Sequence, residues 1–209
     1  MKITQIVESS SRTGLYRIAV DKKPLGFVSA EDIFSLNLIA GRELNSSEYR
    51  QLLSAVQFST FLSLALRYAD RRLRSKKEVI TYLQRKGCDR QTGSSIADKL
   101  ESIGVIDESK LAAAYIHDSK ITKPMSQRLL RQKLMQKKIS PEVVEEKLEA
   151  AKLNDQDALE ALVERKLHLS AYKDNKNRLI RYLLSQGFSY EDIVSRLGRP
   201  EIKKRPRVR

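Results

Sequence analysis

An internal repeat constrains the fold of this chain more than any other feature of its sequence. Three segments begin at Ser75, Ser126 and Asn175, so that their starts are 51 and 49 residues apart. They read SKKEVITYLQRKG, SQRLLRQKLMQKK and NKNRLIRYLLSQG. Each begins with a residue type that caps helices well, and each has apolar residues at helical spacing. A repeat of about fifty residues buries its apolar face against its neighbours, so the pattern predicts tandem helical units.

The equivalence extends to single positions within the three segments. Apolar residues occupy two positions that are four residues apart and therefore share one helix face. These residues are Val79, Leu130 and Leu179 at the first position, and Leu83, Leu134 and Leu183 at the second. Gly87 and Gly187 end the first and third segments, where many helices end in a left-handed residue, and Lys138 takes this place in the second. We therefore expect three equivalent helices.

The register continues into the helices on either side. At a constant offset of 49, Ser140, Glu142, Val144 and Leu148 match Ser189, Glu191, Ile193 and Leu197. In the first repeat Ile96 and Leu100 take the corresponding apolar positions. Asp107 and Asp155 precede further segments with apolar helical spacing, and both are expected to act as N-caps because aspartate suits that position. Each repeat is thus predicted to contain a leading, a middle and a third helix.

The first forty-odd residues have a different pattern. Tyr16, Ile18 and Val20 alternate with less apolar residues, and a second apolar run follows Pro24. This period of two, broken by a turn, predicts a β-hairpin, and residues 3–7 are expected to add a third strand. Ser29 is expected to cap a short helix that Gly41 ends.

Together these patterns predict a mainly α fold, in which tandem three-helix repeats form an elongated, curved body behind a small N-terminal element that contains a β-hairpin. The expected divisions are a β-rich element at 1–44, a first helical unit at 45–106, a second three-helix repeat at 107–154, a third at 155–198, and a disordered basic tail at 199–209.

Nothing in the sequence is typical of a catalytic, cofactor or metal site. The phosphate-binding pattern GxxxxGK[ST], the dinucleotide pattern GxGxxG and the zinc pattern HExxH do not occur. His117, His168 and Cys88 are too few and too far apart in sequence to suggest a metal cluster. We therefore expect a protein without enzymatic activity or cofactor. A single cysteine, and no apolar run of the length that crosses a membrane, favour a cytoplasmic protein that does not bind membranes, and we expect a monomer.

The net charge of +14, from 40 Lys and Arg against 26 Asp and Glu, favours a polyanionic partner. Basic residues recur at related positions of the repeats. The candidate residues for binding DNA or a DNA-containing filament are Arg67, Arg71, Arg72, Arg74, Lys76, Lys77, Lys86, Arg128, Arg131, Lys133, Lys137, Lys176, Arg178 and Arg181. Lys and Arg along a phosphate backbone would bind single- and double-stranded DNA without sequence preference.

Two segments resemble the RecX family, whose members regulate the bacterial RecA recombinase. ALRYADRRLRSKKEVITYLQRKG, at 65–87, is similar to the family's opening block, and LESIGVIDESKLAAAY, at 100–115, is similar to its second block. The resemblance spans about 59–197 and is most specific around Gly104, Ile106 and Asp107. Glu108 stands where an aspartate is common, and Lys138 replaces a usual glycine.

The resemblance implies a modulator that lies in the groove of the RecA–DNA filament, spans neighbouring protomers, and inhibits ATP hydrolysis, strand exchange and co-protease action. Two other functions fit the residues. The first is a stand-alone nucleic-acid-binding or transcription-regulating protein, whose binding to DNA would not depend on the recombinase. The second is a scaffold for an acidic protein, which would show a shallow dependence on salt.

Overall fold

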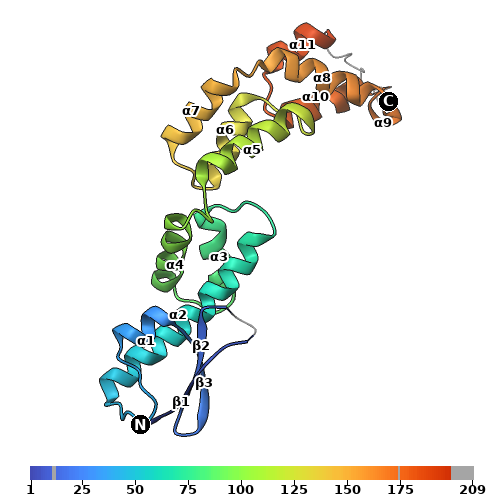
Figure 1. Ribbon diagram of the computed structural model, residues 1–209. Coiled ribbons are helices and arrows are strands. Elements are labelled where there is room, and N and C mark those ends of the chain that lie inside the picture. Colours follow the sequence, from blue (N-terminus) through green and yellow to red (C-terminus); the bar gives the residue numbers. More distant parts are fainter. Residues whose placement is uncertain (11–12, 174, 199–209) are drawn as a thin grey trace. The chain divides into compact units, whose positions relative to one another are not determined.

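The computed structural model describes residues 1–10, 13–173 and 175–198 (Figure 1). In chain order the elements are β1 (Ile3–Glu8), β2 (Leu15–Val20), β3 (Lys23–Ser29), α1 (Ala30–Ser35), α2 (Ser46–Asp70), α3 (Lys76–Arg85), α4 (Arg90–Ser102), α5 (Glu108–Ile121), α6 (Gln127–Gln136), α7 (Pro141–Ala151), α8 (Asp155–Leu167), α9 (Ser170–Lys173), α10 (Lys176–Ser185) and α11 (Tyr190–Leu197). They confirm the predicted mainly helical class with an N-terminal sheet. The predicted tail at 199–209 lies outside the described residues.

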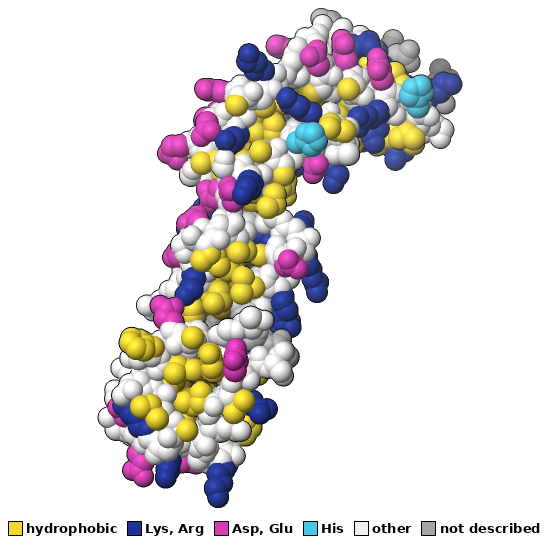
Figure 2. Space-filling model, in the orientation of Figure 1, with side chains coloured by type: hydrophobic (Ala, Val, Ile, Leu, Met, Phe, Trp, Pro, Cys, Tyr) yellow, Lys and Arg dark blue, Asp and Glu magenta, His cyan; other side chains and the backbone are white. Residues whose placement is uncertain are grey.

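The chain divides into two compact units, Met1–Ile106 (unit 1) and Asp107–Arg209 (unit 2). Charged side chains of both signs are spread over the face of each unit that Figure 2 shows. Each unit contains two separate apolar cores in its described part. The elongated arrangement that the repeat predicts stays a prediction.

The N-terminal sheet is antiparallel, in the order β1-β2-β3, and it confirms the predicted hairpin and third strand. Asp21 and Lys22 connect β2 to β3, and both have a positive φ, of 49° and 65°. Two consecutive left-handed residues match the twist of a tight hairpin. The buried side chains of Ile18 and Val28 face a core that includes Leu52 of α2.

Helix α1 begins as predicted but ends earlier than predicted. The Ser29 side chain accepts a hydrogen bond from the Asp32 N–H, which confirms the N-cap. The helix ends at Ser35, because Asn37 takes a left-handed φ of 49°, which asparagine tolerates. The expectation that Gly41 ends the helix is therefore wrong. Gly41 lies in the following loop, where its N–H donates to the Ile3 carbonyl.

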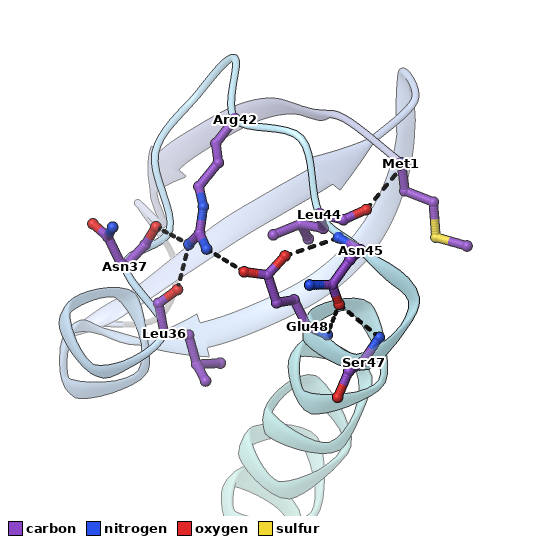
Figure 3. Close-up of polar contacts among 8 residues, drawn as sticks. All are labelled: Met1, Leu36, Asn37, Arg42, Leu44, Asn45, Ser47 and Glu48. Atoms are coloured by element: carbon purple, nitrogen blue, oxygen red, sulfur yellow. Dashed lines mark hydrogen bonds and ion pairs between the residues drawn. The ribbon is translucent and has the colours of Figure 1, made fainter.

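Arg42 ties this loop to the start of α2 (Figure 3). One of its terminal nitrogens donates to the carbonyls of Leu36 and Asn37, at 2.8 and 2.6 Å, and the other pairs with the Glu48 carboxylate. Glu48 also accepts from the Asn45 N–H, while the Asn45 side chain accepts from the Glu48 N–H. This capping box fixes the first turn of α2.

Helix α2 belongs to two cores, because its 25 residues are long enough to serve both. Leu52 and Val56 pack with the sheet, whereas Ala65 packs with Val79 and Leu83 of α3. By length and composition α2 is the one helix of the described residues that could cross a membrane. Since its apolar side chains pack in both cores, α2 is a core helix of unit 1.

The middle helices of the three repeats begin where the sequence predicts. The side chains of Ser75, Ser126 and Asn175 accept hydrogen bonds from the backbone N–H three residues later, before α3, α6 and α10. At the other end Gly87, Lys138 and Gly187 have positive φ angles of 88°, 62° and 88°. All three helices therefore end in the same left-handed conformation, and in the second repeat a lysine adopts it.

One predicted cap is wrong. Asp107 caps α5 as expected, but the N-cap of α8 is Asn154. Asp155 instead accepts a hydrogen bond from the Gln127 N–H at 2.8 Å, so its carboxylate lies at the start of α6. Asn154 can take the cap because its side-chain oxygen accepts the Gln156 N–H. Asp155 thus links the second and third repeats. The short helix α9 is an addition that the three-helix pattern did not predict.

Candidate nucleic-acid interface

Four predicted basic residues are exposed where α2 ends and α3 begins. We call Arg67, Arg71, Arg72 and Lys77 the basic segment. Figure 2 shows Lys and Arg side chains along this edge of unit 1. The Arg72 guanidinium lies 3.7 Å from the Glu78 carboxylate, and the Arg72 side chain as a whole is 63% exposed, so this contact leaves most of the side chain open to solvent. The Ser75 cap sets where α3 starts and thereby fixes the backbone of Lys77.

Two neighbouring candidates are engaged inside unit 1. Arg74 is only 9% exposed, its guanidinium carbon lies 3.8 Å from the centre of the Tyr68 ring, and Tyr68 stacks on Tyr82. The Lys76 ammonium pairs with Glu101 at 2.6 Å and Asp98 at 3.0 Å. The hydrogen bond to Glu101, followed by the one to Asp98, raises the pKa of Lys76. Both charges therefore contribute to the packing of the first repeat rather than to an open surface.

A cation over a tyrosine recurs in the first two repeats. Lys86 and Lys137 stand at equivalent positions, eleven residues after their N-caps. The Lys86 ammonium lies 6.0 Å from the centre of the Tyr82 ring, and that of Lys137 lies 4.9 Å from Tyr115. Lys86 is exposed and Lys137 is half-buried. The ring contact orients both lysines, with Lys86 the more available to a ligand.

The predicted basic residues of unit 2 also differ in how far other groups of the protein engage them and in how exposed they are. Arg131 forms a two-bond pair with the Glu145 carboxylate, at 2.6 and 2.8 Å, which lowers the pKa of Glu145. Arg128 donates to the Gly187 carbonyl, and Arg178 lies 5.3 Å from the centre of the Tyr172 ring. Exposed members of the set are Arg128, Arg178 and Arg181, and half-buried members are Arg131, Lys133, Lys137 and Lys176.

Cationic residues that the sequence did not single out gather around a cavity of about 360 Å³ in unit 2. Lys123, Arg165 and Lys166 line it together with the predicted Lys133. A sequence signal for this site did exist, since Lys133 occupies the position that Tyr82 and Tyr182 hold in the other repeats. The basic residues that line the cavity belong to two different repeats and lie on separate helices and a loop, so composition alone did not reveal it.

Neither a metal cluster nor a reactive thiol is apparent in the described residues. They contain no group of three or more His, Cys, Asp or Glu that could hold a metal ion. Burial raises the pKa of the Cys88 thiol, which favours the unreactive protonated form.

The comparisons with known proteins agree with the repeat architecture. Family models described as the first, second and third three-helix domains of RecX match residues 62–104, 107–148 and 154–195. A "Regulatory protein RecX" of Streptococcus gordonii is 31% identical over 193 residues, covering 91% of this chain and 73% of the relative. One from Streptococcus agalactiae serotype V is 29% identical over 209 residues, covering 98% and 79%.

A solved structure shares the fold. The crystal structure of a regulatory protein RecX covers 93% of this chain and 97% of its own, with a TM-score of 0.71 and 21% sequence identity. The resemblance noted in two segments thus extends over nearly the whole sequence. The chain belongs to the RecX family of regulatory proteins.

Proposed function

We propose that this protein regulates the RecA recombinase by binding the RecA–DNA filament and inhibiting its ATP hydrolysis, strand exchange and co-protease action. Membership of the RecX family is the observation that carries the proposal. The binding is to DNA and recombinase together, with the basic segment facing the DNA phosphates. The chain brings no nucleotide-hydrolysing motif of its own, so the ATP belongs to the recombinase.

Two physical arguments support this mode of action. Three-helix domains in tandem offer serial contacts, and once one is bound the next binds at a high effective concentration. A regulator bound to several protomers holds them in one arrangement, which opposes the changes that ATP turnover requires. The exposed charges of Arg67, Arg71 and Lys77 supply a DNA contact without sequence preference.

The test measures single-strand-dependent ATP hydrolysis by the recombinase while the protein is titrated from trace to equimolar amounts. Inhibition far below one regulator per protomer, with free DNA in excess, is the expected result. If ATP hydrolysis is unaffected while the protein still binds bare DNA, the proposal is wrong and a stand-alone DNA-binding function replaces it.

A charge variant tests the role of the basic segment. Arg71→Gln, Arg72→Gln and Lys77→Gln together remove three positive charges and leave the paired Lys76 intact. If all three contact single-stranded DNA, the slope of log affinity against log salt becomes shallower by about 2, at roughly 0.7 per phosphate contact. The control variant also loses three positive charges, but outside the basic segment. It carries Lys2→Gln, Lys23→Gln and Arg50→Gln, at exposed residues of the N-terminal element and the start of α2. Equal slopes in the two variants would remove the basic segment from the mechanism.

A further inference from the structure

The cavity in unit 2 lies between the second and third three-helix domains. Its walls come from the loop after α5 and from α6, α8 and α10. Lys123 belongs to the loop, Lys133 to α6, and Arg165 and Lys166 to α8. A volume of about 360 Å³ is at the lower end of the range of small-molecule sites, about 300–1,000 Å³. It is therefore suited to a small ligand or to one unit of a polymer.

The charge of the lining is of one sign. Four of its eleven residues are Lys or Arg, and none is Asp or Glu. Within the described part of the chain, no carboxylate forms an ion pair with Lys123, Lys133 or Lys166. Like charges held around a hollow repel one another, and an anion inside it would relieve that repulsion.

Arg165 has a structural role at this site. Its two terminal nitrogens donate to the carbonyls of Thr122 and Ile121, at 3.1 and 2.6 Å. These bonds tie α8 to the end of α5. They occupy both terminal nitrogens of the guanidinium, which would otherwise be able to bind a carboxylate in a bidentate manner. The cations left for a ligand are therefore lysine ammonium groups, which bind phosphate as point charges.

The remaining wall is suited to the organic part of a phosphate ester. Leu162 and Tyr182 line the cavity, and the Lys166 ammonium lies 4.5 Å from the centre of the Tyr182 ring. This contact holds Lys166 in place beside an apolar surface. Lys133 faces the same cavity from the helix position that is a tyrosine in the other two repeats, so the second repeat differs from them at the site itself.

We propose that this cavity binds the phosphate group of a phosphate ester, with Lys123, Lys133 and Lys166 around the anion and the apolar wall against its sugar. The phosphate belongs either to a free nucleotide or to the backbone of a single strand. Binding at this site does not rest on the proposed function, because it requires no recombinase.

The experiment uses the full chain and two probes, thymidine monophosphate and a fluorescent oligothymidylate. Calorimetry gives the dissociation constant for the first probe, and fluorescence anisotropy gives it for the second. In the variant Lys123→Gln with Lys133→Gln, the dissociation constant of the responsive probe should rise about tenfold or more, because two charge-assisted contacts are lost. The conservative variant Lys133→Arg keeps the charge and should bind nearly as the original protein does.

The control removes the same charge outside the cavity, through Lys110→Gln with Lys147→Gln on α5 and α7. If the cavity variant, but not the control, loses affinity for thymidine monophosphate, the ligand is a free nucleotide. If it loses affinity for the oligomer alone, the ligand is backbone phosphate. If the cavity variant and the control bind both probes equally, or if succinate binds more tightly than the phosphate probes, the proposal is wrong. Recombinase inhibition is measured separately, so either proposal can fail alone.

Discussion

Gly87 and Gly187 occupy equivalent positions and share a φ of 88°, but their surroundings differ. A Cβ added at Gly87 would meet nothing within 4 Å. At Gly187 it would lie 2.3 Å from the Ser126 hydroxyl oxygen and 2.7 Å from the Leu129 Cβ. Replacing each glycine with alanine therefore separates the cost of the backbone conformation from the cost of the contact between the second and third repeats.

Both variants carry the penalty of a left-handed alanine, about 1 kcal/mol. Gly187→Ala adds an overpacking cost of about 1–3 kcal/mol, because the atoms it meets belong to a neighbouring helix. Ser126 also caps α6 by accepting the Leu129 N–H, and displacement of its hydroxyl costs about 1 kcal/mol more. The expected loss of unfolding free energy is about 1 kcal/mol for Gly87→Ala and about 3–5 kcal/mol for Gly187→Ala.

Urea denaturation followed by far-ultraviolet circular dichroism gives the overall loss. Since the two units can unfold separately, hydrogen exchange measured on peptides is needed to locate it. Peptides from α6 and α10 should lose protection in Gly187→Ala, whereas Gly87→Ala should affect α3 and α4. Equal losses of free energy in the two variants would refute the reasoning, because they would mean that the contact with Ser126 adds nothing.

Three further predictions concern the ends of helices. Lys138→Gly should raise the unfolding free energy by about 0.5–1 kcal/mol, measured by urea denaturation, because Lys138 has a φ of 62° and glycine adopts that conformation without strain. Asp155→Ala should cost about 1 kcal/mol in the same assay, because it leaves the Gln127 N–H without its acceptor. Backbone hydrogen bonds from Thr92 and Lys110 lower the pKa of Asp89 and Asp107 below their ordinary value of 3.8. The stabilisation from these two carboxylates is thus complete well above pH 3.8 and is lost as the pH falls through their lowered pKa values. In the double variant Asp89→Asn with Asp107→Asn, the urea midpoint should therefore change less with pH in the acid range than it does in the original protein.

Local sequence signals were sufficient for most of the helical framework. Ser75, Ser126 and Asn175 cap their helices because a side-chain oxygen and a backbone N–H three residues later meet without help from the rest of the fold. Where two adjacent residues could both cap, as at Asn154 and Asp155, the choice depended on a distant partner, the Gln127 N–H. The prediction that Gly41 ends α1 failed for a local reason, because Asn37 takes the left-handed conformation earlier in the chain.

The candidate site was less predictable from the sequence than the fold. Counting basic residues selected Arg74 and Lys76 together with exposed residues such as Arg71, although the Tyr68 ring engages Arg74 and two carboxylates of α4 engage Lys76. Whether a cation is open to a ligand depends on the groups that the fold brings beside it.

The sequence by itself determined the RecX repeat, most of the helix starts and the positive charge, because these depend on neighbouring residues and on composition. Only the tertiary structure decided which charges are exposed and that Lys133 meets Lys123 and Lys166 around one cavity. The physical reason is that burial and charge pairing are set by residues brought together from different helices, and no local pattern records those contacts.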